Sequence, residues 1–576
     1  MTGMAAQSSA SRTTPGLFRT DRVLFVVLGL VIAYLALVPL GFLLYTTFFV
    51  DGALSLENFR SAFGSVDMWV LSRNTVVYAL GSALFSITVG TTLAYVVVRT
   101  NAPFRGLVFM SALVPLIMPI ILHTLSWLFL GAERTGWINA ITDYLFGVTP
   151  FNIQSLPGMI WVEGTIQVPL VFLMMYAAFR NMDPALEDSA LTNGARLPTV
   201  IRRITLPLAK PALLSAAFVM IVLGFESFQT PALLGLPKGI VVFTTRIYQL
   251  LGQYPPRFGE AGSFAVILIA MTALGVYTYS RLGKKRGALE TVSGKGFRPH
   301  RYELGRLRWP VGGVILGYFA TQVILPMGML IALSLLPFFQ KPSVEMLSTL
   351  SLDNFRFAFS HSEFLIGMKN SVFLGIGAAL ITMFLMTLTA WVTIRSRIKG
   401  AWALDGLAFI PISTPGIVIG AAILIAYLRL PFIPIYGTIW ILLLAYVTKY
   451  MPYGMRYSSG AMHQIGTELE EAARTSGAST LQTIRRIILP LVTPGFLAGF
   501  IWIMVQATRE LPTSIILYAP GTQVLGVVIW NDWEAGMATE LAAEGLLMIA
   551  LASILTIIAR SIANRFGVQD QQIRGL

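Results

Sequence analysis

The chain has 576 residues, of which 55% are apolar and 12% are charged, and its mean hydropathy is +0.73. Soluble proteins carry about twice this share of charged residues, and a soluble chain of this composition would expose too much apolar surface to stay dispersed. The composition therefore excludes a soluble protein and predicts an all-α polytopic membrane protein. The chain contains no cysteine, which excludes disulfides, thiolate metal sites and cysteine nucleophiles.

The N-terminal region is predicted to be a polar tail followed by a retained first span. Residues 1–22 are mostly polar and include Arg12, Arg19 and Arg22, and a long apolar run follows them. This run exceeds the apolar core of a signal peptide, and no small-x-small cleavage site ends it. Apolar stretches of about 20 residues, separated by charged or Pro/Gly-rich breaks, predict twelve spans. Their limits are 23–47, 69–98, 107–130, 158–179, 211–235, 261–280, 310–337, 364–394, 403–428, 436–457, 494–518 and 541–560.

The distribution of basic residues predicts the orientation of these spans. With both termini in the cytoplasm, most of the 41 Lys and Arg residues fall in or beside cytoplasmic segments, as the positive-inside rule requires. Nine of them lie between Arg281 and Arg308, in a stretch that reads as a linker. The net charge of +14 is therefore interpreted as a topology signal, and no nucleic-acid partner is expected.

A polar segment occurs twice in this apolar chain. Residues 187–211 read EDSALTNGARLPTVIRRITLPLAKP, and residues 470–494 read EEAARTSGASTLQTIRRIILPLVTP. At a constant shift of 283 without a gap, 13 of the 25 positions are identical, whereas chance gives roughly one or two. A charged segment repeated so well indicates a functional surface that each half of the chain presents once.

The repeat extends over nearly the whole chain. Ser55–Arg60 matches Ser351–Arg356 at a shift of 296, and the change to 283 indicates extra residues in the first half, in Gly131–Pro157. Six spans per half is an even number, so the two repeats enter the membrane in the same direction and are parallel. The predicted organisation is an N-terminal tail (1–22), a first half (23–281), a basic linker (282–308), a second half (309–560) and a C-terminal tail (561–576).

Each copy of the repeated segment is predicted to be a short helix, a glycine turn and a second short helix on the cytoplasmic side. Leu469, Ala472, Ala473 and Ser476 are spaced as one helix face made mostly of small residues, which permits close approach of a partner. Acidic residues occupy the first turn, where the helix dipole favours them. Gly477 suits a left-handed C-terminal stop, and Pro490 is expected to end the second helix and start the next span.

This pattern resembles the EAA loop of permease subunits of bacterial ATP-binding-cassette (ABC) importers of the type I fold. In that family the loop is a coupling helix that docks on an ATPase subunit. The first copy departs from the pattern in having Asp188 and Ser189 where Glu and Ala are usual. Carried over residue by residue, the resemblance implies ATPase-coupling roles for Glu187, Asp188, Ala190, Gly194, Pro207, Glu470, Glu471, Ala472, Ala473, Gly477 and Pro490.

The resemblance also implies partners and a place in the cell. Two copies in one chain imply two ATPase subunits, one per half, a binding protein that delivers the solute, and a bacterial inner-membrane location. The chain has no G-x-x-x-x-G-K-[ST] motif, and Gly294-Lys295-Gly296 lacks the hydroxyl residue. ATP and Mg are therefore expected on the partner subunits, with no cofactor, no catalytic residue and no assigned metal ligand in this chain.

Charged residues within spans are costly in a bilayer and usually functional. Glu226 in the fifth span, and Arg509 and Glu510 in the eleventh, are candidates for lining the pathway, with a buried ion pair as the alternative role. Glu163 and His123 are weaker candidates, since a lone intramembrane histidine more often serves packing. The nearby polar residues Ser227, Gln229 and Gln506 are interpreted either as part of the pathway or as hydrogen-bonding contacts between helices.

The fused layout and the Glu-Leu-Pro-Thr stretch at 510–513 are most similar to permeases of the ferric-iron importer group. Related permeases handle thiamine, polyamines or phosphonates, and specificity resides mainly in the external binding protein. A secondary transporter with 6+6 repeats is the remote alternative. The inner loops at Arg99–Pro103 and Arg395–Lys399 lack the Asp expected in the largest family of that class. No paired catalytic acids, metal triad or nucleophile motif supports a membrane enzyme.

Overall fold

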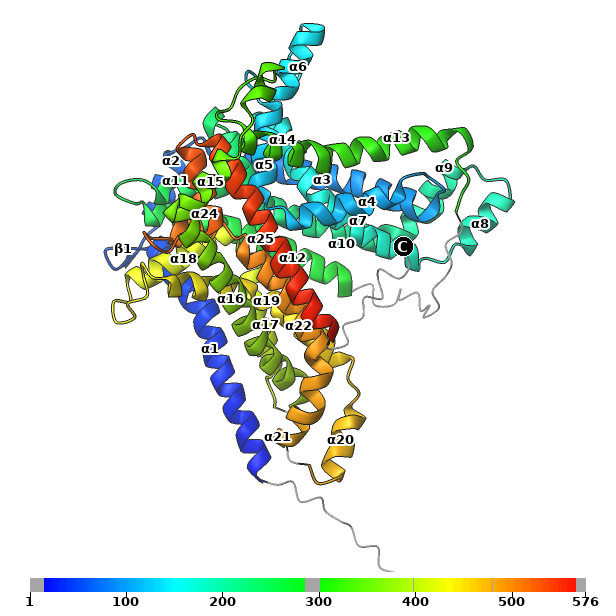
Figure 1. Ribbon diagram of the computed structural model, residues 1–576. Helices are drawn as coiled ribbons and strands as arrows, with labels where there is room; N and C mark the ends of the chain where they lie inside the picture. The colour runs from blue at the N-terminus through cyan, green and yellow to red at the C-terminus, as the bar shows by residue number, and fades with distance from the viewer. Residues whose placement is uncertain (1–14, 285–300, 397, 479, 566–576) are drawn as a thin grey trace, which may run out of the picture.

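The computed structural model describes residues 15–284, 301–396, 398–478 and 480–565 (Figure 1). This part of the chain is almost entirely helical. Its strands are β1 (Phe49–Val50) and β2 (Ala53–Leu54), which form a small antiparallel hairpin after the first helix. The all-α fold class predicted from composition is confirmed.

The first half begins with α1 and ends with α12. Its helices, including the π turns η1 and η2 and the 3-10 turn η3, are α1 (Pro15–Phe48), α2 (Glu57–Gly64), α3 (Met68–Arg99), α4 (Arg105–Ile117), α5 (Ile120–Gly131), α6 (Trp137–Phe146), α7 (Leu156–Asn181), α8 (Ala185–Thr192), α9 (Leu197–Val200), η1 (Ile201–Thr205), α10 (Leu206–Glu226), η2 (Pro231–Gly235), η3 (Leu236–Lys238), α11 (Phe243–Leu251) and α12 (Phe258–Lys284).

The second half repeats this order. Its helices, with the π turns η5 and η8 and the 3-10 turns η4, η6 and η7, are η4 (Gly305–Leu307), α13 (Arg308–Phe319), η5 (Ala320–Ile324), α14 (Leu325–Leu335), η6 (Glu345–Thr349), α15 (Asp353–Ser360), α16 (Ser362–Arg395), α17 (Trp402–Phe409), η7 (Ile410–Ser413), α18 (Gly416–Leu428), α19 (Ile439–His463), α20 (Thr467–Thr475), α21 (Thr480–Thr483), η8 (Ile484–Ile488), α22 (Leu489–Thr508), α23 (Ser514–Leu517), α24 (Leu525–Glu534) and α25 (Ala538–Arg565).

Each half is built around three long helices that pack on one another. In the first half α3 packs on α7 and α10, and in the second half α16 packs on α19 and α22. Glycines allow close contact at these crossings. Gly90 on α3 lies against Val171 on α7, and Gly454 on α19 lies against Met386 on α16. Because lipid supplies little hydrophobic drive between helices, such small-residue contacts are a main source of packing energy.

The opening helices of each half pack on the other half. Helix α1 lies against α17 and α18, and helices α13 and α14 lie against α4 and α5. Hydrogen bonds cross these contacts. The hydroxyl groups of Tyr34 and Tyr427 lie 2.7 Å apart, and the Gln322 side-chain amide donates to the Thr165 carbonyl at 2.8 Å. This exchange joins the two sequence repeats into one structural unit.

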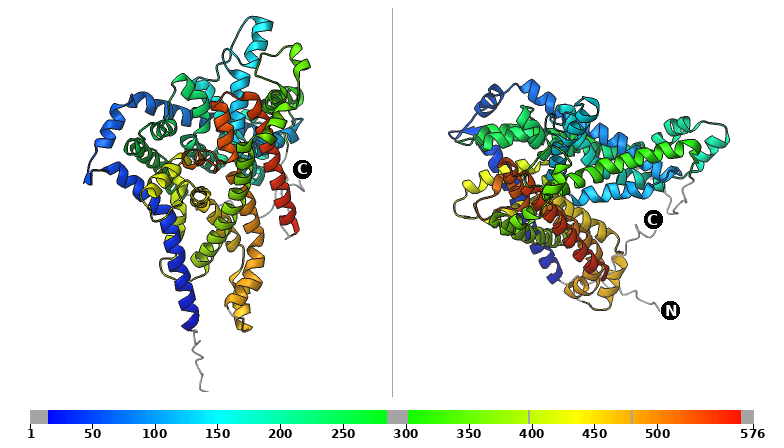
Figure 2. Two further views of the ribbon diagram at one scale, coloured as in Figure 1. Left: turned by 60° about the vertical axis from the view of Figure 1, so that its left-hand side comes forward. Right: turned by 45° about the horizontal axis from the view of Figure 1, so that its top comes forward.

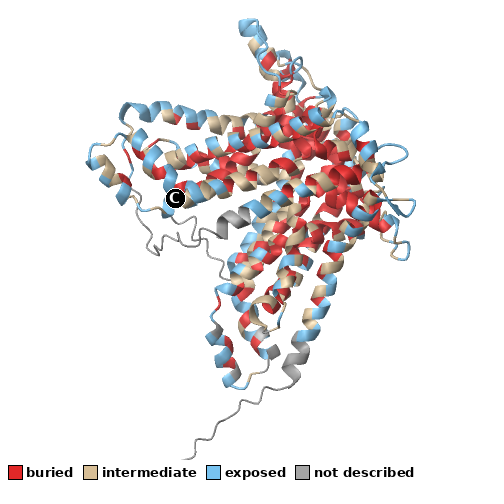
Figure 3. Cartoon of the chain, turned by 180° about the vertical axis from the view of Figure 1, so that it is seen from behind, coloured by how far each residue is buried: buried red, intermediate tan, exposed pale blue. Residues whose placement is uncertain are grey.

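The two bundles meet at one end and diverge toward the other. In Figure 1, α3, α7 and α10 run toward α8 and α9, whereas α16, α19 and α22 run toward α20 and α21. The views in Figure 2 show the same separation from two other directions. Figure 3 shows that buried residues gather where the bundles meet. The two repeated segments therefore lie at the separated ends of a V-shaped molecule.

Eleven of the twelve predicted spans overlap an apolar helix or a bent helix pair of the described residues. The described residues contain nine helices long and apolar enough to cross a membrane, or up to eleven if each of two bent pairs is one span. The predicted spans 107–130 and 403–428 are these pairs, with bends of 111° and 107°. Pro119 and Pro415 immediately precede the second helix of each pair. Proline cannot continue a helix without losing a hydrogen bond, so the apolar run breaks there.

The predicted span 436–457 corresponds to α19, which is long enough to cross a membrane but is not among the helices apolar enough to do so. It carries Lys449 and Arg456. Helix α19 packs against both α16 and α22. Because neighbouring helices cover much of its surface, it needs less apolar sequence than a lipid-facing helix.

The predicted spans 211–235 and 494–518 begin and end too late. The apolar helices run over Leu197–Glu226 and Arg485–Thr508, so Pro207 and Pro490 do not end the preceding helix. A π turn directly precedes each of these prolines. Proline normally clashes with the carbonyl four residues earlier, and the wider π turn moves that carbonyl away.

The predicted insertion and linker are partly visible. Residues 132–155, which include α6, connect α5 to α7, whereas only residues 429–438 connect α18 to α19. The extra residues of the first half therefore fall where the change of shift places them. Helix α1 already begins at Pro15, within the predicted tail 1–22. Most of the linker and the outer parts of both tails lie outside the described residues, and the predicted domain limits remain predictions.

We expect Gly224→Ala to lower the thermal stability of the detergent-purified protein. A Cβ atom at Gly224 would lie 2.9 Å from the Ala79 backbone on α3, and overpacking of this kind costs about 1–3 kcal/mol. Gly317 on α13 faces open space, so Gly317→Ala is the matched control and should leave the unfolding temperature unchanged or slightly raised. Equal unfolding temperatures for the two variants would contradict the close α3–α10 contact.

Candidate functional site

The two repeated segments have the predicted helix–glycine–helix plan. Helix α8 ends before Gly194, which has φ +85°, and α20 ends before Gly477, which has φ +81°. Residues other than glycine rarely adopt this left-handed conformation. A second short helix follows each turn and leads through a π turn into α10 or α22. The prediction of a glycine stop at both positions is confirmed.

A buried ion pair fixes the first segment to the long helix α3. The Arg99 guanidinium lies 3.1 Å from the Glu187 carboxylate, and both side chains are fully buried. The same carboxylate accepts hydrogen bonds from the Thr205 hydroxyl at 2.6 Å and the Tyr302 hydroxyl at 3.0 Å. Arg99 also donates to the Met182 carbonyl, at 3.1 Å. Several partners thus offset the cost of removing both charges from water.

The second segment is fixed in the same way to α16. The Arg395 guanidinium lies 2.9 Å from the Glu470 carboxylate, and both side chains are more than nine-tenths buried. Arg395 also donates to the carbonyls of Met462 and Ile465, at the end of α19. Arg99 and Arg395 are the last residues of α3 and α16. In each half one arginine therefore joins the repeated segment to the end of a long helix.

Each repeated segment has one face that is buried against the protein and one face that is exposed. Glu187, Glu470 and Ala473 are buried, so the predicted face that combined Leu469, Ala472, Ala473 and Ser476 is only partly right. The exposed stripe consists of Leu186, Ser189 and Asn193, on and just after α8, and of Leu469, Ala472 and Ser476, on and just after α20. Glu187 and Glu470 occupy equivalent positions in the two copies, and their buried side chains attach each segment to the protein. The exposed stripe is the surface available to a partner.

The other predicted coupling residues lie on or next to these elements. Glu471 is exposed, whereas Asp188 and Ala190 are half-buried. Pro207 and Pro490 are exposed in the first turns of α10 and α22. Their coupling roles remain predictions.

Tyr302 makes the first segment different from the second. This linker residue pairs with the loop after α3, since its backbone donates to the Arg99 carbonyl and accepts from the Asn101 amide. Burial and the neighbouring Glu187 carboxylate raise the pKa of Tyr302. Its hydroxyl therefore keeps the proton that it donates to Glu187. The end of the linker is thus part of the support beneath α8.

A second cluster of charged residues, centred on Glu510, lies away from the repeated segments. The Lys449 ammonium lies 2.6 Å from the Glu510 carboxylate, which also accepts hydrogen bonds from Tyr450 and Thr513. Glu226 lies close enough to interact electrostatically with both Lys449 and Glu510. Two of the predicted pathway residues, Glu226 and Glu510, therefore lie near each other, although they belong to different halves. The ion-pair alternative holds for Glu510, which pairs with Lys449.

Arg509 contacts both halves. Its guanidinium donates to the Met118 carbonyl at 3.4 Å, at the break between α4 and α5, and to the Gln506 side chain. The constant shift of 283 places Arg509 opposite Glu226 in the repeat. The two halves thus bring opposite charges to equivalent positions near their interface. Whether these residues line a pathway remains a prediction.

The weaker candidates are held by hydrogen bonds within the first half. Glu163 accepts from Tyr78, Ser227, Thr230 and Gln167 at 2.8–3.2 Å. His123 is buried, with its ring 3.4 Å from the Thr165 hydroxyl. These contacts are those of packing residues. Gln229 is also buried, and it lies between Ser227 and Thr230 of this network in the sequence.

The charged and linker residues of these sites that were not predicted are Arg99, Arg395, Lys449 and Tyr302. The two arginines recur at the shift of 296 at the ends of the second and eighth predicted spans, and that recurrence was an available signal. Lys449 is a charge within a predicted span, which by itself indicates a special environment. Nothing in the sequence indicated that Tyr302 would reach the first segment.

We expect Arg395→Gln to release the second segment. The substitution leaves Glu470 buried without its cation, which costs about 3–5 kcal/mol. Hydrogen exchange in residues 467–478 should become faster and transport should be lost, while the amount of protein in the membrane stays unchanged. Arg429→Gln, at an exposed position outside both repeated segments, is the control. The double variant Arg395→Gln/Glu470→Gln should recover part of the protection, because no buried charge is left unpaired. Exchange in Arg395→Gln equal to that of the control would contradict the role of the ion pair.

Comparison with known proteins agrees with these features. Residues 371–568 match the family model of the binding-protein-dependent transport system inner membrane component. The ferric transport system permease protein FbpB of Actinobacillus pleuropneumoniae is 24% identical over 492 residues, covering 84% of this chain and 68% of that protein. The probable ABC transporter permease protein y4fN of Sinorhizobium fredii is 24% identical over 96% of this chain and 98% of its own length.

Shorter relatives match about one half of the chain. The spermidine/putrescine transport system permease protein PotC of Haemophilus influenzae is 27% identical over 196 residues, covering 34% of this chain and 75% of that protein. A matched domain in the second half, full-length relatives and an internal repeat with two EAA segments lead to one conclusion. These findings support an ABC importer permease, with both halves fused in one polypeptide.

Proposed function

We propose that this permease binds two ATPase subunits, one on the α8–η1 segment and one on the α20–η8 segment, and couples their ATP hydrolysis to solute uptake. The observation that carries the proposal is the ion pair that recurs in both halves, Arg99–Glu187 and Arg395–Glu470. Each ion pair attaches a short helix at the surface to the end of a long helix, so that the two move together. A force applied to the exposed stripe is therefore transmitted into the bundle.

The V shape suggests how that force would act. The segments lie at the separated ends of the two bundles, and the bundles meet at the opposite end (Figure 1). Partner subunits that approach each other on binding ATP would draw α8 and α20 together. Because α3 and α16 follow their segments, the separated ends would close and the opposite contact would open. This is rigid-body alternation of access between two sides of a membrane. ATP and Mg would be held by the partner subunits.

We propose ferric iron as the cargo, delivered by a solute-binding protein on the outer side of a bacterial inner membrane. Support comes from relatives whose alignments cover most of the chain, among them two further ferric permeases of Haemophilus influenzae, at 25% and 22% identity. Polyamine and 2-aminoethylphosphonate permeases match only about a third of the chain. Both termini would then lie in the cytoplasm, on the side of the ATPase subunits.

Single-cysteine variants test the docking surface directly, because the natural chain has no cysteine. Leu186→Cys and Leu469→Cys place a thiol on each exposed stripe. We expect the partner ATPase to slow labelling of both thiols by a polar maleimide several-fold. Tyr254→Cys is the control, because Tyr254 is fully exposed between α11 and α12, away from both segments, and its labelling should not change. Unchanged labelling at both stripes in an assembled complex would contradict the docking proposal.

The cargo is tested with the complete complex in proteoliposomes. Vesicles that contain the permease and its ATPase should accumulate ⁵⁵Fe³⁺ when ATP is inside and the iron-loaded binding protein is outside. Spermidine, thiamine and 2-aminoethylphosphonate, each offered with the same binding protein, should not accumulate. Uptake of one of these in place of iron would overturn the cargo proposal and leave the docking proposal intact. The permease without its ATPase should hydrolyse no ATP.

A further inference from the structure

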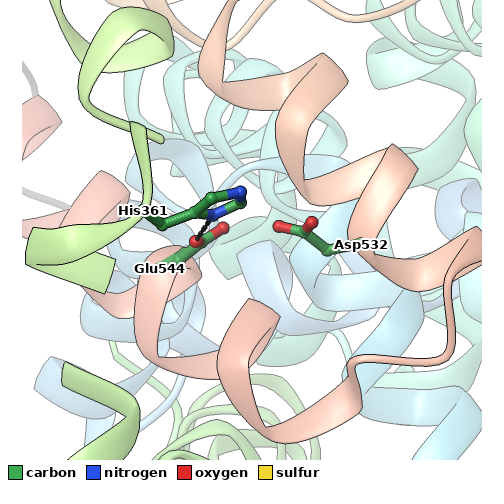
Figure 4. A group of neighbouring side chains, drawn as sticks. All are labelled: His361, Asp532 and Glu544. Atoms are coloured by element: carbon green, nitrogen blue, oxygen red, sulfur yellow. Dashed lines mark hydrogen bonds and ion pairs between the residues drawn. The ribbon is translucent and has the colours of Figure 1, made fainter. Parts of the chain in front are cut away.

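Three side chains with metal-binding chemistry converge at the end of the second half opposite the repeated segment. His361 lies between α15 and α16, Asp532 lies on α24, and Glu544 lies on α25. Figure 4 shows all three pointing toward one another. The His361 Nδ1 atom lies 2.8 Å from the Glu544 Oε1 atom, and one ligand atom from each residue lies within 4.8 Å of the others. The residues come from three separate elements, so tertiary packing creates the group.

Two carboxylate oxygens in this group are buried and unsatisfied. Glu544 is fully buried and Asp532 is 6% exposed. The Asp532 Oδ2 and Glu544 Oε2 atoms have no hydrogen-bond donor among the described residues. Buried polar atoms without a partner are rare in native proteins, and a bound ion is one common reason for them.

The surrounding charges are also negative. The charged groups that act most strongly on Asp532 are Glu544, His361 and Glu363, and those on Glu544 include Glu540 and Glu363. His361 is the one basic side chain among these groups. A bound cation would therefore remove a concentration of negative charge that the nearby protein leaves uncompensated.

The corresponding place in the first half is built differently. At the shift of 296, Ser65 takes the position of His361. There the carboxylate is Glu260, which lies 3.2 Å from Arg257, and Arg246 donates to the Ser65 hydroxyl at 3.0 Å. Arginine thus supplies the positive charge in the first half. The second half has two carboxylates and an imidazole in the equivalent elements, so its missing positive charge must come from elsewhere.

We propose that His361, Asp532 and Glu544 bind one first-row transition-metal ion, through the imidazole Nδ1 atom and one oxygen of each carboxylate. An imidazole with two carboxylates suits Zn²⁺, Mn²⁺ or Fe²⁺, whereas Ca²⁺ and Mg²⁺ prefer shells made of oxygen alone. Ligands at about 2.0–2.2 Å from such an ion lie roughly 3 Å apart when adjacent, close to the separation of His361 and Glu544. The His361 side chain is 19% exposed, which gives the ion a route from solvent.

The ion would fix α24 in place. Trp530, two residues before Asp532, stacks on Phe228 and contacts Tyr248, both from the first half. An ion that joins Asp532 to α25 and to the start of α16 would therefore stabilise the end at which the two bundles meet. The site does not depend on the identity of the transported solute.

Metal content of the full-length chain tests this proposal. The protein is purified in detergent with a histidine-free affinity tag, stripped with a chelator and dialysed against Zn²⁺, Mn²⁺ or anaerobic Fe²⁺. We expect the wild type to retain about one ion per chain of at least one of these metals by mass spectrometry, with its unfolding temperature raised by the ion. Glu544→Gln and His361→Ser should reduce metal affinity at least about tenfold and abolish the thermal shift.

The controls separate a specific site from loss of folding. His361→Ser installs the residue that the first half carries at this position, which should keep the fold, and Glu260→Gln alters the matching carboxylate of the first half. Glu260→Gln should retain metal as the wild type does. If the wild type holds no more of any of the three metals than His361→Ser, the proposal is overturned. Neither ATPase nor binding protein is present, so the result is independent of the proposed cargo.

Discussion

The ion pair between each repeated segment and the end of a long helix is the interaction on which the rest of the architecture depends. A short helix on a membrane protein surface has little stability of its own, because helices shorter than about 12–15 residues are marginal in water. Arg99 and Arg395 overcome this by drawing a glutamate of the segment into the protein. Burial makes each contact costly to break, and it turns a surface loop into an extension of the bundle.

The exchange of opening helices complements these ion pairs. Helix α1 packs on the second half, and α13 and α14 pack on the first half. The two repeats therefore cannot separate as independent bodies, and relative movement must pivot where they meet. The buried core lies at that meeting point (Figure 3), whereas the segments lie at the free ends. This arrangement suits the proposed mechanism, in which ATPase subunits would act at the free ends and the opposite end would open or close in response.

The two halves share a backbone plan but differ in their charges. Glu226 and Arg509 occupy equivalent positions with opposite signs. Glu510 is neutralised by Lys449, whereas Glu163 in the first half accepts hydrogen bonds from hydroxyl and amide groups. At the end opposite the repeated segments, the first half has Arg246 and Arg257, whereas the equivalent elements of the second half carry His361, Asp532 and Glu544. Gene duplication preserves the packing, but a single solute pathway between two halves does not require equal side chains on its two sides.

The sequence by itself determined the fold class, the repeat, the glycine stops at Gly194 and Gly477, and the family to which the EAA segments belong. Each of these is local, because apolar run length, a fixed shift and left-handed glycine conformations can be read along the chain. It did not determine the breaks at Pro119 and Pro415 or the continuous helices through Pro207 and Pro490. The effect of a proline depends on the turn before it and on the helices around it.

Only the tertiary structure decided which charges meet. Arg99 and Glu187 are 88 positions apart, and Tyr302 reaches the same carboxylate from the linker. His361, Asp532 and Glu544 come from three elements and carry no spacing that indicates a metal site. Charges within a bilayer protein must find partners wherever the fold places them. Their pairing is therefore a property of helix packing, and the sequence shows only that each charge is present.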